Sequence, residues 1–177
     1  MNKDRQGLIQ IYTGNNKGKT TAALGLTVRA VGHGFRVFII QFMKGRQDYG
    51  ELKGLKRLEP ECQLEQYGSP GWVVKGEAEE KDIQEALKGL ERAREIIMSG
   101  QWDVVILDEI INAIWFELLP EEKVIELLEQ KPSHVEIVLT GRNASPRLIE
   151  KAHLVTEMVP IKHPFQLGIE ARKGIEY

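Results

Sequence analysis

The sequence predicts a three-layer α/β domain with a mostly parallel central sheet. Short runs such as residues 37–40 and 104–107 are apolar throughout, which is typical of strands buried on both faces. Longer stretches between such runs repeat apolar residues at helical spacing. An alternation of strands and helices favours parallel strands with helices packed on both faces of the sheet.

The first half of the chain begins with a strand over residues 8–13, which leads directly into a glycine-rich loop. Residues 20–34 predict a helix, because threonine is followed by alanine and leucine and the stretch ends in two glycines. Residues 35–42 are rich in Val, Ile and Phe and predict a second strand. We expect a short helix near residues 51–58 and a shorter strand over 63–67.

The second half contains the clearest helix, over residues 77–98, where apolar residues recur at helical spacing between charges. An apolar strand over 103–109 ends in two carboxylates. Two helices are expected next, over 110–119 and 120–130, the second started by Pro120. A strand over 135–142, a short helix over 145–152 and a final strand over 153–159 complete the pattern.

Composition limits the function. A chain of 177 residues, 42% hydrophobic and 28% charged, fits one domain over residues 1–177. The net charge of −2 gives no support for nucleic acid held by general electrostatics. The chain has no apolar run long enough for a signal peptide or a membrane span, so we expect no membrane association and a cytoplasmic location. The single Cys62 excludes an intramolecular disulfide.

The glycine-rich loop is similar to a phosphate loop, G-x-x-x-x-G-K-[ST], but not identical to it. Counting back from Gly18-Lys19-Thr20, the first glycine of that pattern falls on Thr13, and Gly14 comes one residue late. A strand before the loop and a helix after it suit an anion site at the helix N-terminus. Lys19 would reach phosphate oxygens and Thr20 would help to hold Mg²⁺. The alternative is a plain turn with an exposed lysine.

Asp108 and Glu109 supply an independent reason for a nucleotide site. They end a buried strand, and in a parallel sheet all strands end on the same side as the phosphate loop. Such carboxylates hold the Mg²⁺ of a nucleoside triphosphate, directly or through water. The alternative is that these acids lie at the N-terminus of the next helix and interact favourably with its dipole. Together the two halves predict a P-loop NTPase-like (RecA-like) fold that binds MgATP or MgGTP, and the absence of a guanine-reading motif favours ATP.

The chain strongly resembles the P-loop ATP:corrinoid adenosyltransferases, the cob(I)alamin adenosyltransferases. The matching segments span nearly the whole chain: TGNNKGKTTAA (13–23), RAVGHG (29–34), QFMKG (41–45), LDE (107–109), TGR (140–142) and KHPFQLGIEARKGIEY (162–177). The resemblance implies that the 5′-deoxyadenosyl group of ATP passes to the Co(I) of a reduced corrinoid, cobalamin or a precursor such as cob(I)yrinic acid a,c-diamide. Tripolyphosphate is the leaving group.

The same resemblance implies the site residues and the cofactors. The phosphate cradle would comprise Gly14, Asn15, Asn16, Lys17, Gly18, Lys19, Thr20 and Thr21. Mg²⁺ or Mn²⁺ would be held by Thr20, Asp108 and Glu109, and Arg142 would contact the nucleotide. Lys19 and Trp72 are the expected catalytic residues. ATP would lie reversed in the loop, with its γ-phosphate where other P-loop proteins place the α-phosphate.

On the corrin side, the resemblance implies that aromatic residues exclude the lower cobalt ligand. Trp72 is the candidate, Tyr67 could be its partner, and a buried anchoring role for Trp72 is the alternative. His163 and Phe165 also match family positions. The family further implies a homodimer and an electron-donating flavoprotein as partner.

The sequence departs from the family at two points. Asn16 replaces a loop glycine, and we expect its tolerance of positive φ to preserve the loop. Many members carry a long N-terminal arm that covers the corrin, and because the first strand is expected to begin near Leu8, we expect that arm to be short or absent here. Two other functions stay open at this stage: a P-loop kinase or ATPase that cleaves the β–γ bond, and a module that binds nucleotide or corrinoid without turnover.

Overall fold

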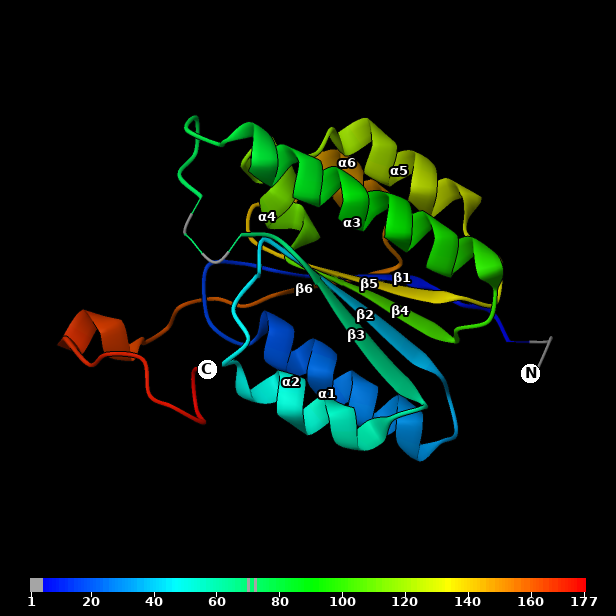
Figure 1. Cartoon of the computed structure of the whole chain (residues 1–177), viewed down its shortest axis with the longest axis horizontal. Coiled ribbons are helices and arrows are strands. Elements are labelled where there is room, and N and C mark those ends of the chain that lie inside the picture. Colours follow the sequence, from blue (N-terminus) through cyan, green and yellow to red (C-terminus); the bar gives the residue numbers. More distant parts are fainter. Residues whose placement is uncertain (1–4, 70, 72) are drawn as a thin grey trace.

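The structure is a computed structural model that describes residues 5–69, 71 and 73–177. In this part of the chain, six strands form one sheet in the order β3-β2-β4-β5-β1-β6 (Figure 1). All neighbouring strands are parallel, which confirms the predicted α/β class. The strands are β1 (Ile9–Thr13), β2 (Val37–Phe42), β3 (Cys62–Tyr67), β4 (Val104–Asp108), β5 (Glu136–Thr140) and β6 (Leu154–Glu157).

Helices cover both faces of the sheet. In Figure 1, α1 and α2 lie on one face, and α3, α4, α5 and α6 lie on the other. The α-helices are α1 (Lys19–Gly32), α2 (Gly50–Leu55), α3 (Glu80–Ser99), α4 (Ile110–Trp115), α5 (Glu121–Gln130) and α6 (Pro146–Lys151). Two 3₁₀ helices, η1 (Lys56–Leu58) and η2 (Pro164–Leu167), follow α2 and β6. This is the predicted three-layer arrangement, and it is a P-loop NTPase-like fold.

Several helix boundaries differ from the prediction, and two of the differences have clear local reasons. The helix expected from residue 77 begins at Glu80, because Glu79 and Asp82 form a reciprocal capping box. The helix expected over 110–119 ends at Trp115. The chain turns there through Glu117, whose φ is 62°, and this turn buries Leu118 and Leu119. Burial of those two leucines outweighs continuation of the helix.

The core lies on both faces of the interior strands β2 and β4. Every residue of β2 and β4 is buried, as expected for strands between two helical layers. Along β2, Phe38 packs into the cluster on the α3 side, whereas Ile39 packs into the cluster on the α1 side. The register places Gln41 beside Asp108 and Tyr12 beside Thr140. The polar ends of four strands are therefore gathered at one edge of the sheet, which we call the carboxyl edge.

Over the residues that the structure describes, none of the helices has both the length and the apolar character that a membrane span requires.

Candidate functional site at the carboxyl edge

The loop between β1 and α1 needs a glycine where the sequence places Gly14. The φ of Gly14 is 97°, in the left-handed region, and that of Gly18 is 128°. A Cβ at Gly14 would lie 2.5 Å from the carbonyl oxygen of Met158. Thr13, one residue earlier, is the last residue of β1 and is buried. The glycine comes one residue later than in the phosphate-loop pattern because β1 extends through Thr13. The chain turns only at Gly14, where it lies against the segment that follows β6.

Asn16 is tolerated for a reason that differs from the prediction. Asn16 is not among the residues with positive φ. This loop position therefore does not need the left-handed backbone conformation that asparagine was expected to tolerate. Its side-chain amide donates to the carbonyl oxygen of Val159 at 3.2 Å, and its backbone N–H donates to Met158 at 3.0 Å. Asn16 therefore fastens the loop to the segment after β6.

Lys19, the first residue of α1, folds back over its own loop. Its ammonium donates to the carbonyl oxygens of Gly14 at 2.8 Å and Asn16 at 2.7 Å. Burial lowers the pKa of Lys19, and the nearby charge of Arg142 lowers it further, against the attraction of Glu109 and Asp108. Neutral carbonyl groups thus hold the ammonium above the loop. It could leave them to form an ion pair with an anion bound in the loop.

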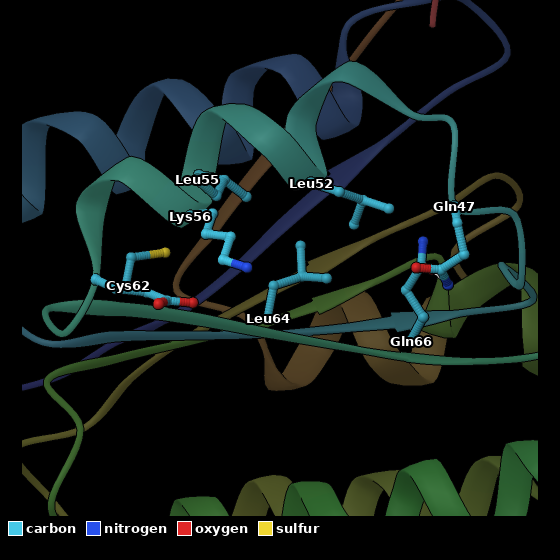
Figure 2. A pocket seen from close by; sticks show the side chains of 8 residues that line it. Gln47, Leu52, Leu55, Lys56, Cys62, Leu64 and Gln66 are labelled. Carbon is cyan, nitrogen blue, oxygen red and sulfur yellow. Dashed lines mark hydrogen bonds between the residues drawn. The ribbon is translucent and has the colours of Figure 1, made fainter.

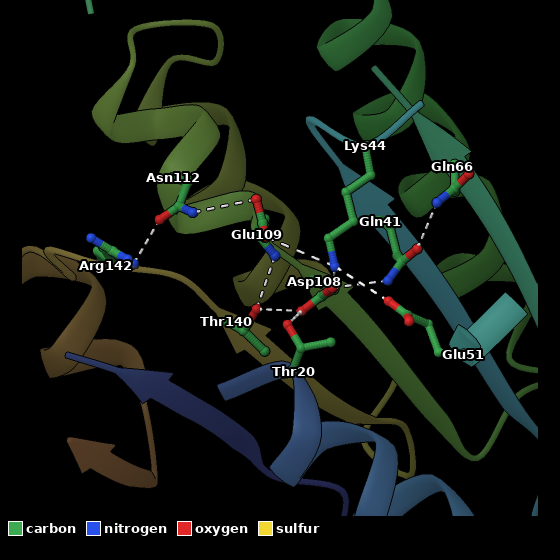
Figure 3. A network of polar contacts seen from close by, with 10 residues as sticks. All are labelled: Thr20, Gln41, Lys44, Glu51, Gln66, Asp108, Glu109, Asn112, Thr140 and Arg142. Carbon is green, nitrogen blue, oxygen red and sulfur yellow. Dashed lines mark hydrogen bonds and ion pairs between the residues drawn. The ribbon is translucent and has the colours of Figure 1, made fainter. Parts of the chain in front are cut away.

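Asp108, at the end of β4, is the centre of the site (Figure 3). Its Oδ1 accepts hydrogen bonds from the hydroxyls of Thr20 at 2.8 Å and Thr140 at 2.7 Å. Its Oδ2 accepts from the amide of Gln41 at 3.1 Å and the ammonium of Lys44 at 2.9 Å. The carboxylate is buried, and these four donors occupy all of its acceptor positions. The bond from Thr20 joins the phosphate loop to the acidic strand end, as the sequence predicts.

Glu109 differs from its neighbour in conformation and in partners. Its φ is 63°, an uncommon value for a glutamate, and its backbone N–H donates to the hydroxyl of Thr140 at 2.9 Å. Its side chain is 31% exposed and receives a long hydrogen bond of 3.4 Å from Asn112. Strained backbone of this kind is concentrated at functional sites. Glu109 therefore presents a carboxylate with free acceptor positions at the carboxyl edge.

The pKa values of the two carboxyls shift in opposite directions. Burial alone would raise the pKa of Asp108, but the charge and hydrogen bond of Lys44, together with the two threonine hydroxyls, hold it below its usual value. For Glu109, burial raises the pKa, and the attraction of Lys44 does not fully offset burial and the repulsion from Asp108. Asp108 is thus fixed as an anion, whereas Glu109 would gain from a further cation nearby.

Three residues of this site were missed from the sequence: Gln41, Lys44 and Thr140. Lys44 forms an ion pair with Asp108 at 2.9 Å and lies 3.8 Å from both Glu109 and Glu51 (Figure 3). All three residues lie within or next to the segments QFMKG and TGR, which matched the family. The signal that could have identified them was their position near the carboxyl end of a strand: Gln41 within the end of β2, Lys44 two residues after β2, and Thr140 at the end of β5.

The other predicted site residues have diverse surroundings. The backbone N–H of Arg142 donates to Asn112 at 2.7 Å, which places Arg142 beside Glu109, with an exposed side chain. Asn15, Lys17 and Thr21 are exposed on the loop and the first turn of α1. Trp72 lies outside the described residues.

The remaining candidates on the corrin side lie away from Asp108. Tyr67 packs partly against the core, and its hydroxyl donates to Glu65 at 2.8 Å. Burial and that hydrogen bond raise the pKa of Tyr67 to about 12. His163 caps η2 by accepting from the N–H of Phe165, and the ring of Phe165 is 78% exposed.

A cavity of about 320 Å³ lies between α2 and the edge strand β3 (Figure 2). Leu52, Leu55 and Leu64 form its apolar walls, and Gln47 and Gln66 lie at one end. Gln47 donates to Gln66 at 3.1 Å, Gln66 donates to Gln41 at 3.0 Å, and Gln41 donates to Asp108. Three amides thus connect the cavity to the buried carboxylate.

Metal binding at the carboxyl edge would need ligands from outside the protein. Within residues 5–69, 71 and 73–177, no three His, Cys, Asp or Glu side chains are grouped closely enough to hold a metal ion. Mg²⁺ commonly binds proteins through one or two carboxylates together with substrate phosphates. The hydroxyl of Thr20 and the carboxylate of Glu109 fit that pattern, with a triphosphate supplying further oxygens.

Comparison with known proteins agrees with this geometry. Residues 5–177 match the family model described as ATP:corrinoid adenosyltransferase BtuR/CobO/CobP. A corrinoid adenosyltransferase of Escherichia coli K12 is 35% identical over 99% of this chain and 88% of its own length. One from a Sinorhizobium species is 40% identical over 98% and 82%, and one from Pseudomonas aeruginosa is 34% identical over 99% and 86%. With its phosphate loop joined to an acidic strand end, the chain belongs to the ATP:corrinoid adenosyltransferase family.

Proposed function

We propose that this protein transfers the 5′-deoxyadenosyl group of ATP to the Co(I) centre of a reduced corrinoid and releases tripolyphosphate. The family supports the enzyme class and both substrates. The observation that carries the proposal is the hydrogen bond between Thr20 and Asp108, which brings the two halves of a triphosphate site together. We infer that residues 1–177 work as one unit, since the family match covers nearly all of them.

The residues at the carboxyl edge suit Mg²⁺ or Mn²⁺ as the metal. Glu109 and the hydroxyl of Thr20 would be its ligands, because Glu109 has free acceptor positions. Asp108 would hold Thr20 in place, since its own four positions are occupied. When bound, the metal would neutralise charge on the triphosphate. In this assignment the adjacent acids have separate tasks, one positioning and one binding.

The proposed reaction needs no general base, because Co(I) is a strong nucleophile that carries no proton. The bond between the 5′ carbon and its oxygen breaks, the cobalt–carbon bond forms, and the electron pair leaves with tripolyphosphate. The protein must orient the 5′ carbon and stabilise the departing charge. Lys19 and the N–H groups of residues 14–21 suit the second task. The reversed ATP that the family implies would turn the 5′ carbon away from the loop.

The corrin side of the proposal rests on the family rather than on contacts. Trp72, with Tyr67 as the candidate for its aromatic partner, would exclude the lower cobalt ligand and so ease reduction of Co(II) to Co(I). Arg142, beside Glu109, would contact the nucleotide. We also propose a homodimer, an electron-donating flavoprotein as partner and a cytoplasmic location.

The proposal is tested by incubating the protein with MgATP and chemically reduced cobalamin, followed by analysis of the phosphate products. We expect tripolyphosphate together with a light-sensitive cobalt–carbon product. ADP and phosphate would instead indicate a kinase or an ATPase. Binding of both substrates without either product would indicate a module without turnover.

A second experiment separates the two roles of Trp72. The variant Trp72→Ala should lose more activity when the corrinoid is supplied as Co(II) with a reductant than when it is supplied as Co(I). Equal losses in the two assays would mean that Trp72 only anchors its loop.

A further inference from the structure

Helix α4 ends in two aromatic side chains with different surroundings. Phe116 packs partly against the core, whereas the indole of Trp115 is 44% exposed. Directly after them the chain turns at Glu117, whose φ is 62°. An indole carries a large apolar surface, so leaving nearly half of it uncovered forgoes part of the gain from burial. Trp115 is therefore better explained by a contact at the surface than by packing in the core.

The surface contact of Trp115 is a lysine from the loop between β3 and α3. The ammonium of Lys75 lies 3.7 Å from the centre of the indole ring, within the range of a cation–π interaction. Lys75 belongs to a turn in which the N–H of Glu77 donates to the carbonyl oxygen of Val74 at 3.0 Å. Gly76 completes this turn with a φ of 83°, a conformation suited to glycine. We call the contact between Lys75 and Trp115 the clasp.

The clasp is one of two points at which this loop is attached to the rest of the protein. Val73 packs partly against the core, and it lies with Tyr67 and Leu118 around a small space. Lys75, two residues later, contacts α4 instead. In the sequence, Val73 is the first residue after Trp72 and Lys75 is the third. The two attachments therefore fix the chain on the C-terminal side of Trp72.

The same short helix reaches the nucleotide side of the carboxyl edge (Figure 3). Glu109 directly precedes α4, and Asn112 donates to Glu109 at 3.4 Å and accepts from the backbone N–H of Arg142 at 2.7 Å. Trp115 follows Asn112 by three residues, a spacing that makes side chains neighbours on a helix surface. About two turns of helix thus separate Glu109 from the clasp.

We propose that Trp115 is a positioning residue for the corrinoid. Through the clasp it holds the loop that contains Trp72 against α4, and the first turn of α4 is held in turn by the contacts of Asn112. The loop is thereby kept in a set position relative to the bound nucleotide when the corrinoid binds. The clasp acts through this loop and not on the reacting atoms. This inference rests on the proposed function, in which a corrinoid is the substrate.

The test is the coordination of cob(II)alamin bound with MgATP and no reductant, a state in which no turnover takes place. Electron paramagnetic resonance distinguishes Co(II) that keeps its lower ligand from Co(II) that has lost it. Wild type should bind part of the cobalamin without the lower ligand. Lys75→Met and Trp115→Ala should each lower the ratio of ligand-free to ligand-bound Co(II) by about two- to fivefold, the effect of one cation–π contact at a partly exposed site.

Matched variants separate the clasp from other effects. Lys75→Arg and Trp115→Phe keep a cation over a ring and should retain most of the wild-type ratio. The double variant, Lys75→Met with Trp115→Ala, should lose no more than either single variant, since both remove the same contact. Lys88→Met removes an exposed lysine of α3 and should leave the ratio unchanged. The affinity for MgATP should be the same in all of them, because the contacts of Asn112 are untouched.

An unchanged ratio in Lys75→Met would overturn the inference, and because this side chain is exposed, its replacement leaves the fold intact. Additive losses in the double variant would also overturn it, since the two residues would then act separately. A wild type that adenosylates pre-reduced cobalamin but never binds Co(II) without the lower ligand would overturn the inference and leave the proposed transfer standing. Absence of transfer by wild type to pre-reduced cobalamin would instead overturn the proposed function, and this inference with it.

Discussion

The carboxyl edge and the C-terminal arm, residues 159–177, both contain segments typical of the family, but they differ in how far their side chains are buried. At the edge, Asp108 is buried and bonded to donors from four elements or loops. In the arm, all residues except His163 and Glu176 are exposed, including Phe165 and Leu167. The edge is therefore organised before any substrate arrives, whereas the arm buries almost none of its apolar surface.

This difference shows that the carboxyl edge is preorganised and the arm is not. Strand register and two helical layers fix the buried carboxylate of Asp108 and its donors, so this part of the edge needs little rearrangement on binding. The arm has the properties of a segment with low local stability: few buried apolar contacts and exposed hydrogen bonds. Apart from the bond that Val159 accepts from Asn16, its hydrogen bonds, such as those between Arg172 and Glu176, are local. Contacts to substrate or partner would have to provide the missing burial.

The largest expected effect comes from the edge. Lys19→Ala should lower kcat/KM by about 100-fold or more, because one fixed donor to developing charge is lost. The fold should be retained, since the ammonium of Lys19 contacts only carbonyl groups of its own loop. Kinetics with pre-reduced corrinoid and a thermal melt of the same sample check both points. Full activity in this variant would contradict the phosphate role of the loop.

The next effect separates Asp108 from Glu109. Asp108→Asn should lower the free energy of unfolding by about 3 kcal/mol, because Lys44 loses its buried counter-charge. The matched variant Glu109→Gln should lose metal-dependent ATP binding with little change in stability. Urea unfolding and ATP titration with and without Mg²⁺ measure the two properties. If Glu109→Gln were the more destabilised of the two, the division of tasks between these acids would be wrong.

A smaller effect concerns backbone strain at the edge. Glu109 has a φ of 63°, which glycine adopts without cost, so Glu109→Gly should raise the free energy of unfolding by about 1 kcal/mol while metal binding is lost. Glu109→Gln retains the strain and serves as the control. Equal stability of the two variants in urea would show that the turn at Glu109 stores no strain.

The contrast between edge and arm also explains what the sequence could predict. These strands were predicted because residues 37–40 of β2 and 104–107 of β4 are apolar without interruption, a pattern set by burial on both faces. The closeness of Asp108 to the glycine-rich loop was predicted from parallel strands that end on one side, although the hydrogen bond from Thr20 was not. Lys44 was missed because a lysine after a strand is usually exposed, and only the fold brings it against three acids. The role of Asn16 depends on the position of Val159, 143 residues away.

The smallest expected effect on folding comes from the arm. Deleting residues 161–177 keeps the contacts of Asn16 with Met158 and Val159, and it removes residues that are almost all exposed. We expect the free energy of unfolding to change by less than about 0.5 kcal/mol. The affinity for MgATP should stay close to that of wild type, because the edge is complete without the arm.

Turnover with corrinoid should nevertheless fall in the shortened protein, since Phe165 and Leu167 present apolar surface that is free to meet a large ligand or a second copy of the chain. Phe165→Ala in the full-length protein is the matched control, and it should reproduce part of the loss without affecting MgATP. Unfolding, MgATP titration and the corrinoid assay are run on the same preparations. A large loss of stability on deletion would mean that the arm packs on the edge in solution, and the two regions would then form one preorganised unit.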